Sequence, residues 1–160
     1  MKRILYYSLL IISSIVLNSC GNKDFFEYSR TGDVCRIPII KPLEVTSYSD
    51  GNTWFLNLPF QTIKNYKIID NVTLIGIKDS IISVYSQETY ISQYSKMTQA
   101  WFIIDMNRKK EIVFDNEKEY KEELNKLSID EIKLYDVKQV FNDFDLKKEL
   151  PVEWNHNSIP

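Results

Sequence analysis

One apolar run dominates the second half of the sequence: Ala100-Trp101-Phe102-Ile103-Ile104-Asp105-Met106. Its apolar residues fall on both alternating faces, which is typical of a central strand that is covered from two sides. The polar segment 107–110 follows as a turn, and residues 111–114 are expected to return as the neighbouring antiparallel strand. This run therefore predicts the middle of an antiparallel sheet.

Further strands are expected on the N-terminal side of this run. Residues 72–77 and 81–86 are rich in β-branched side chains and flank a short polar turn, which predicts a hairpin. Proline interrupts the earlier part of the chain, so that an edge position or an irregular crossing is expected there. The extended segments expected in that part are 37–40, 43–48 and 53–58.

Residues 85–99 are polar and aromatic, and they follow neither the helical nor the strand period. We therefore expect a long loop or a fraying extension of the preceding strand, and loops of this length often carry function. Tyr85, Tyr90 and Tyr94 lie in this segment, and tyrosine offers a large contact area with a polar tip. These three tyrosines are the expected partner-binding residues.

Two helices are expected after the strands. Asn116 and Glu119 have the spacing of an N-terminal capping box, and Asp136 is placed to cap a second helix. Apolar residues recur at helical spacing in that second helix, at Val137, Val140, Phe141 and Phe144. The order of elements predicts an α+β domain, with a mainly antiparallel sheet of about five to seven strands and two C-terminal helices packed on it.

The N-terminus has the pattern of an export signal. Lys2 and Arg3 form a short positive region before residues 4–17, which carry no charge. This uncharged run is shorter than the roughly 20 apolar residues that a membrane-spanning helix needs. Its length and its positive flank favour a signal peptide over a transmembrane helix.

The end of the apolar run, Leu17-Asn18-Ser19-Cys20, resembles the lipobox of bacterial lipoproteins. The resemblance implies that Cys20 receives a diacylglyceryl group and becomes the new N-terminus when residues 1–19 are removed. Asn18 departs from the small or apolar residue that is usual at its position. Two or more acyl chains anchor a protein stably on a membrane without a transmembrane helix. Gly21 stands where some bacteria place an inner-membrane retention aspartate, which favours the outer membrane.

The mature chain is expected to form one domain. Residues 20–33 are assigned to the lipidated cysteine and a tether, 34–154 to a single globular α+β domain, and 155–160 to a frayed tail. The whole chain has a formal charge of −2, and loss of the signal leaves 18 basic against 22 acidic side chains, a charge of −4. Nucleic-acid binding needs clustered Lys and Arg, so no nucleic-acid partner is expected.

Few residues suit catalysis or metal binding. The single histidine, His156, lies near the C-terminus, and Cys35 has no cysteine to pair with once Cys20 carries lipid. Histidine-assisted nucleophilic catalysis, a zinc or copper site and a glycine-rich phosphate loop are therefore not expected, and neither is a cofactor. Asp105 and Asp115 could form a carboxylate pair, although acids at strand ends and helix starts are common for structural reasons.

Three functions are compatible with these features. The leading hypothesis is a membrane-anchored envelope lipoprotein with a small non-enzymatic domain that binds another protein, of which an immunity-type inhibitor would be one version. The alternative is a glycan-binding accessory lipoprotein, because tyrosine also suits the faces of sugars. The third is a carboxylate-dependent hydrolase that uses Asp105 and Asp115.

Overall fold

The computed structural model describes residues 25–48, 51–60, 68–92 and 95–154. The expected export signal, the lipobox and the C-terminal tail lie outside these residues. The described strands are β1 (Arg30–Thr31), β2 (Val34–Ile40), β3 (Leu43–Tyr48), β4 (Phe55–Asn57), β5 (Ile68–Ile69), β6 (Val72–Lys78), β7 (Ile81–Ser92), β8 (Ser95–Asp105), β9 (Lys110–Phe114) and β10 (Tyr135–Asp136). The described helices are α2 (Glu117–Lys126) and α3 (Val137–Lys147).

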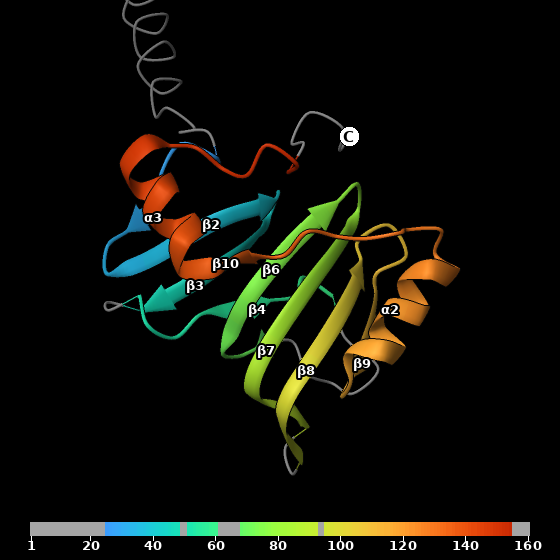
Figure 1. Ribbon diagram of the computed structural model, residues 1–160. Coiled ribbons are helices and arrows are strands. Elements are labelled where there is room, and N and C mark those ends of the chain that lie inside the picture. The colour runs from blue at the N-terminus through green and yellow to red at the C-terminus, as the bar shows by residue number, and fades with distance from the viewer. Residues whose placement is uncertain (1–24, 49–50, 61–67, 93–94, 155–160) are drawn as a thin grey trace, which may run out of the picture.

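These strands form two antiparallel sheets of five strands each (Figure 1). The first sheet has the order β1-β2-β3-β4-β5, and the second has the order β10-β6-β7-β8-β9. The chain passes from the first sheet to the second at Asp70 and Asn71, between β5 and β6. The predicted α+β class, with antiparallel pairing and two helices after most of the strands, is confirmed. The division into two sheets was not predicted.

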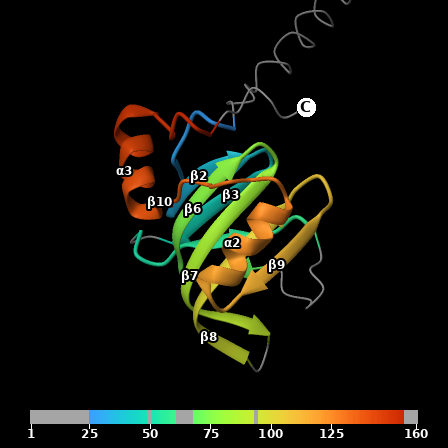
Figure 2. The same cartoon turned by 45° about the vertical axis from the view of Figure 1, so that its right-hand side comes forward.

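The second sheet is the middle layer of the domain. One of its faces packs against the first sheet and α3 in the main core, which contains Ile37, Val45 and Phe141 beside Ile82 and Ile104. Its other face, called here the outer face, carries α2, while β2 and β3 lie behind the sheet (Figure 2). Both faces are therefore covered, although the outer face only in part.

Strand β8 confirms the prediction made from the apolar run. It lies between β7 and β9, and Phe102 and Ile104 enter the main core on one face. Ile103, on the opposite face, joins a smaller cluster with Tyr120 and Leu124 of α2. A strand with apolar residues on both faces is stable only when two layers cover it.

The predicted helix caps are present. The Asn116 side chain accepts a hydrogen bond from the Glu119 amide, with Oδ1 and N 2.9 Å apart. Asp136 accepts in the same way from the Gln139 amide, also at 2.9 Å. Each cap satisfies one of the amide groups that a helix start leaves without a partner. The apolar side chains predicted to face the core from α3 are all buried, namely Val137, Val140, Phe141 and Phe144.

The segment between α2 and β10, residues 127–134, is called the connector. It crosses the outer face directly above Gly76 of β6. A Cβ atom at Gly76 would lie 2.3 Å from the carbonyl oxygen of Lys133 and 2.8 Å from Cγ2 of Ile132. Glycine is therefore needed at this position because the backbone of the connector approaches the strand too closely for any side chain.

Of the two alternatives expected for residues 85–99, the structure shows an extension of the strand and not a long loop. Strand β7 continues to Ser92 and β8 begins at Ser95, so the two form a long hairpin that projects beyond β6 and β9 (Figure 1). Glu88 has a positive φ of 53° inside β7. The buried position consequently moves from Ser86 to Thr89, and this change breaks the two-residue period that identifies a strand in a sequence.

The N-terminal segment, residues 25–29, packs on the domain through Arg36. The Arg36 guanidinium donates hydrogen bonds to the carbonyl oxygens of Tyr28 (2.8 Å) and Phe25 (3.1 Å). It also lies 4.9 Å from the ring centroids of these two residues and pairs with Glu44 at 2.6 Å. The Arg36 side chain is only 6% exposed, so its charge is compensated by the carboxylate and the carbonyl groups.

Two further residues, Cys35 and Trp154, pack in the main core. Cys35 is a free thiol that is buried in the main core, as expected for a small apolar residue. Trp154 is also buried and joins the C-terminal segment to the same core. Within the described residues, no helix has the length and apolar character needed to cross a bilayer.

Candidate functional site

Four large side chains form a continuous row across the outer face. The strand register pairs Leu74 of β6 with Tyr85 of β7, Tyr85 with Trp101 of β8, and Trp101 with Phe114 of β9. All four residues are partly exposed. The rings of Tyr85 and Trp101 pack with their centroids 4.9 Å apart. We call these four residues, which are three aromatic side chains and Leu74, the aromatic row.

The aromatic row is exposed because the layer above the sheet ends beside it. The neighbouring row on the outer face contains Gly76, Ser83 and Ile103, and it is covered by the connector and by α2. Tyr120 of α2 marks this boundary: its hydroxyl donates a hydrogen bond to Ser83 Oγ at 3.0 Å, and its ring contacts Phe114. Trp101 and Phe114 pack in part against the cluster beneath α2, and all four residues of the aromatic row remain partly exposed.

Two glutamines flank the aromatic row on the side of the hairpin. Gln87 and Gln99 are paired across β7 and β8, and both side chains are exposed. Gln87 Nε2 lies 3.5 Å from the hydroxyl of Tyr85, and Gln99 Nε2 donates to the carbonyl oxygen of Asp115 at 3.4 Å. The surface therefore combines apolar rings with amide groups and has no charged side chain of its own.

A groove of about 460 Å³ adjoins the aromatic row between α2 and the connector. Trp101 belongs to both features, since it also lines this groove. Charged side chains stand around the groove, with Glu117 and Lys121 on α2 and Asp130 and Glu131 on the connector. Glu117 and Lys121 pair with each other at 2.7 Å. We call this feature the α2 groove.

Two side chains that line the α2 groove, Tyr120 and Lys121, have raised pKa values. Burial raises the pKa of the Tyr120 phenol, and the hydrogen bond to Ser83 offsets part of this effect. The hydrogen bond to Glu117 raises the pKa of Lys121, with a smaller contribution in the same direction from Glu131. Both groups therefore keep their protons at neutral pH, and Lys121 is charged there.

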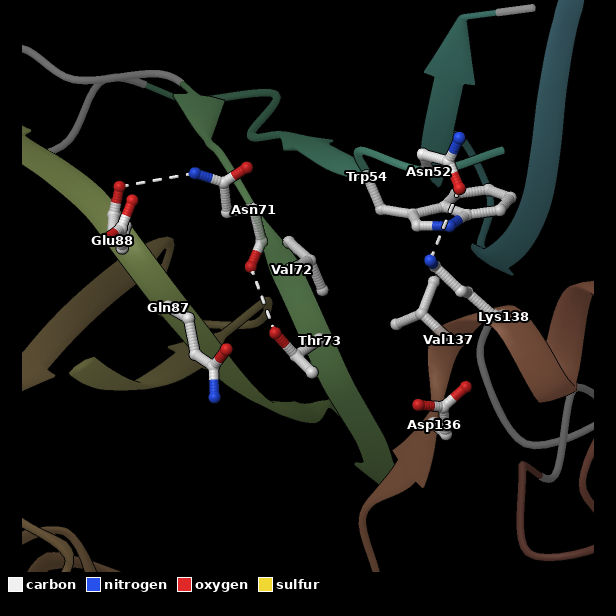
Figure 3. A pocket seen from close by; sticks show the side chains of 10 residues that line it. All are labelled: Asn52, Trp54, Asn71, Val72, Thr73, Gln87, Glu88, Asp136, Val137 and Lys138. Atoms are coloured by element: carbon white, nitrogen blue, oxygen red, sulfur yellow. Dashed lines mark hydrogen bonds between the residues drawn. The ribbon is translucent and has the colours of Figure 1, made fainter. Parts of the chain in front are cut away.

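A second recess lies at the edge of β6 (Figure 3). It has a volume of about 340 Å³ and is lined by side chains from the start of β6, from β7, from α3 and from the loop before β4. Its charged groups already have partners: Lys138 donates to Asn52 Oδ1 at 3.4 Å, Asp136 caps α3, and Glu88 pairs with Lys96. The recess offers amide and hydroxyl groups, but its lining contains no nucleophile beside a base.

The three predicted tyrosines are not brought together. Tyr85 belongs to the aromatic row, whereas Tyr90 lies further along the hairpin, where it is 46% exposed and contacts Lys96. Tyr94 lies outside the described residues. The hairpin is held by Asp70, whose Oδ1 accepts hydrogen bonds from the Thr89 hydroxyl and from the Tyr90 amide.

The two predicted carboxylates lie far apart. Asp105 is paired with Lys110 at one end of β9, while Asp115 follows the other end of this strand. At about 3.3 Å per residue the two positions are roughly 16 Å apart, more than the ~5–9.5 Å that glycosidases use. Asp105 instead accepts a hydrogen bond from the Arg108 amide at 2.9 Å. Within the described part of the chain, no His, Cys, Asp and Glu side chains gather in threes that could hold a metal ion.

Comparison with protein families, curated proteins and solved structures finds no match for this chain. The candidate site consequently depends on the geometry alone. The sequence placed Trp101 in a strand that is covered from two sides, and it gave no reason to single out Gln87 or Gln99. The strand alternation would have placed Tyr85, Gln87, Gln99 and Trp101 on one face if residues 85–99 had been treated as a hairpin.

Proposed function

We propose that this chain is a lipid-anchored envelope protein whose non-enzymatic domain binds another protein through the aromatic row. The lipobox-like residues Leu17 to Cys20 support the anchor, and Gly21 favours the outer membrane. The observation that carries the binding function is the partly exposed pair of Tyr85 and Trp101 on adjacent strands. Trp and Tyr are the residues most enriched at the energetic centres of protein interfaces.

The position of the aromatic row supports a binding function for a second reason. Its four side chains project from the rigid strands of the middle layer, so little conformational entropy is lost when a partner covers them. A large apolar row with polar neighbours is also the usual composition of an interface centre and its rim. An immunity-type inhibitor of a toxin in the envelope is one form that this function would take.

Glycan binding is the second candidate function. The amides of Gln87 and Gln99 beside the rings of Tyr85 and Trp101 favour it, because sugars present an apolar face for stacking and hydroxyl groups for hydrogen bonds. The hydrolase hypothesis is not carried forward, since Asp105 and Asp115 lie at opposite ends of β9.

The experiment is capture of partners from membranes with the mature lipidated chain after cross-linking. A Tyr85→Ala/Trp101→Ala variant is expected to lose the captured protein, whereas Tyr48→Ala, which changes a tyrosine that is 68% exposed on β3, is expected to keep it. A Gln87→Lys/Gln99→Lys variant leaves the packed rings intact and is also expected to lose the partner.

Unchanged capture by both variants of the aromatic row would contradict the proposal. Binding of the wild-type domain to a neutral glycan on an array, lost in the same two variants, would instead favour the second candidate function.

A further inference from the structure

We propose that the α2 groove binds a basic side chain of the protein partner, with arginine as the better fit. This inference rests on the proposed function and names the chemistry of the partner at one position. The occupant is an arginine or lysine in an exposed segment of the partner, which enters between α2 and the connector while neighbouring residues cover the aromatic row.

The shape and the lining of the groove support a long side chain with an apolar stem. Trp101 and Leu134 are partly exposed and line the groove, while Leu124 and Ile132 lie at its base and are almost fully buried. The volume of about 460 Å³ exceeds what one side chain fills, so the occupant keeps some of its water. Arginine and lysine place their methylene groups along apolar surface and keep the charged end in water.

The net negative charge of the groove favours a positively charged side chain. Glu117, Lys121, Asp130 and Glu131 together carry a formal charge of −2. Lys121 Nζ forms an ion pair with Glu117 Oε1 at 2.7 Å, whereas Asp130 and Glu131 have no ion-pair partner among the described residues. These two carboxylates lie on one side of the groove, where they favour a cation and disfavour an acidic or purely apolar segment.

Trp101 adds a preference between the two basic residues. A guanidinium stacks on an indole face better than an ammonium does, because it is planar and less strongly hydrated. The same planar group can donate two parallel hydrogen bonds to a carboxylate. The aromatic row would therefore supply contact area, and the α2 groove would supply selectivity for an arginine.

The test uses the mature lipidated chain in phosphatidylcholine nanodiscs, which do not attract cations. The probe is a labelled hexapeptide with two adjacent arginines, compared with the same peptide containing citrulline, and binding is followed by anisotropy at low salt. Trp54 and Trp154 are buried, so a change in intrinsic fluorescence that disappears in Trp101→Phe reports on the groove.

We expect saturable binding of the arginine peptide, at least tenfold weaker binding of the citrulline peptide, and loss of binding at high salt. Each exposed ion pair is worth up to about fivefold in affinity, so an Asp130→Asn/Glu131→Gln variant is expected to bind about tenfold more weakly. Glu122→Gln, which changes an α2 acid outside the groove, is the matched control and is expected to bind as wild type.

Equal binding of the arginine and citrulline peptides, or unchanged binding by Asp130→Asn/Glu131→Gln, would overturn the inference. A neutral oligosaccharide that changes Trp101 fluorescence while the peptide does not would overturn it as well. If partner capture still depends on Tyr85 and Trp101 while no arginine peptide binds, only this inference fails. If capture is independent of both residues, the proposed function fails.

Discussion

Arg36 holds the N-terminal segment on the first sheet, and Arg36→Met is expected to release it. The guanidinium donates to Glu44 Oε2 at 2.7 Å and to the carbonyl oxygens of Tyr28 and Phe25 at 2.8 and 3.1 Å. Methionine keeps a flexible apolar stem at this position but removes every donor and the charge. The two carbonyl groups would then have to find water or remain without a partner.

The expected loss of stability follows from these contacts. A hydrogen bond from a charged donor contributes roughly 1.5 kcal/mol, and Arg36 donates two of them to backbone carbonyls. Glu44 is 33% exposed and is rehydrated in the variant, so its ion pair adds only about 1 kcal/mol. Methionine retains part of the contact with the two rings. The free energy of unfolding is therefore expected to fall by about 4 kcal/mol, which lowers Tm by roughly 13 °C.

Urea unfolding of the mature chain measures this loss, and limited chymotrypsin digestion reports on the segment itself. Release would expose Phe25, Phe26 and Tyr28, so cleavage there is expected to become faster. Arg108→Met is the control, because Arg108 is 72% exposed and pairs weakly with Asp105, and it should cost less than about 0.5 kcal/mol. A loss below about 1 kcal/mol for Arg36→Met, with unchanged cleavage, would refute the role assigned to Arg36.

Four further changes test other parts of the structure. Gly76→Ala is expected to destabilise the domain by about 2 kcal/mol in urea, because a methyl group has no space beneath the connector. Asn116→Ala removes the cap of α2 and is expected to cost about 1 kcal/mol in the same assay. The Ser29 hydroxyl, followed by Arg30, holds the pKa of Asp145 below its ordinary value of 3.8. The stabilisation by Asp145 should therefore be complete above that value and vanish as the pH falls through the lower folded pKa. Urea titrations between pH 6 and 2 should show the stability difference between wild type and Asp145→Asn shrinking in that range. Cys20→Ala is expected to abolish labelling with a palmitate analogue and to leave unprocessed precursor, and persistent labelling would contradict the lipid anchor.

Local patterns in the sequence predicted the parts of the fold that depend on neighbouring residues. The two faces of β8 and the caps at Asn116 and Asp136 were visible because strand alternation and helix starts are encoded within a few positions. The two-sheet arrangement depends instead on contacts between distant segments, such as the hydrogen bond from the Val72 amide to the Trp54 carbonyl at 2.9 Å. No pattern within one strand indicates which sheet it joins.

The candidate site was only partly predictable for the same reason. Tyr85 was singled out by its position in a polar segment, but the exposure of Trp101 depends on where α2 ends above the sheet. The sequence left the hairpin as one of two alternatives, because both of its strands continue beyond β6 and β9 and few of their side chains there, such as Ile91 and Met97, pack against the main core. In addition, the positive φ of Glu88 moves the buried position in β7 from Ser86 to Thr89, so the two-residue alternation of a strand is lost there.

The packing of residues 25–29 on the first sheet would also limit how far the domain can move from the proposed lipid anchor. Five residue steps lead from Cys20, the proposed lipid site, to Phe25 at the start of the packed segment. Five extended residues span at most about 17 Å. With the proposed lipid on Cys20, a connection this short would keep the domain in a thin shell above the membrane, where effective concentrations would reach the millimolar range. A partner in the same membrane would be captured there even by weak contacts, whereas a freely diffusing competitor would gain no such advantage.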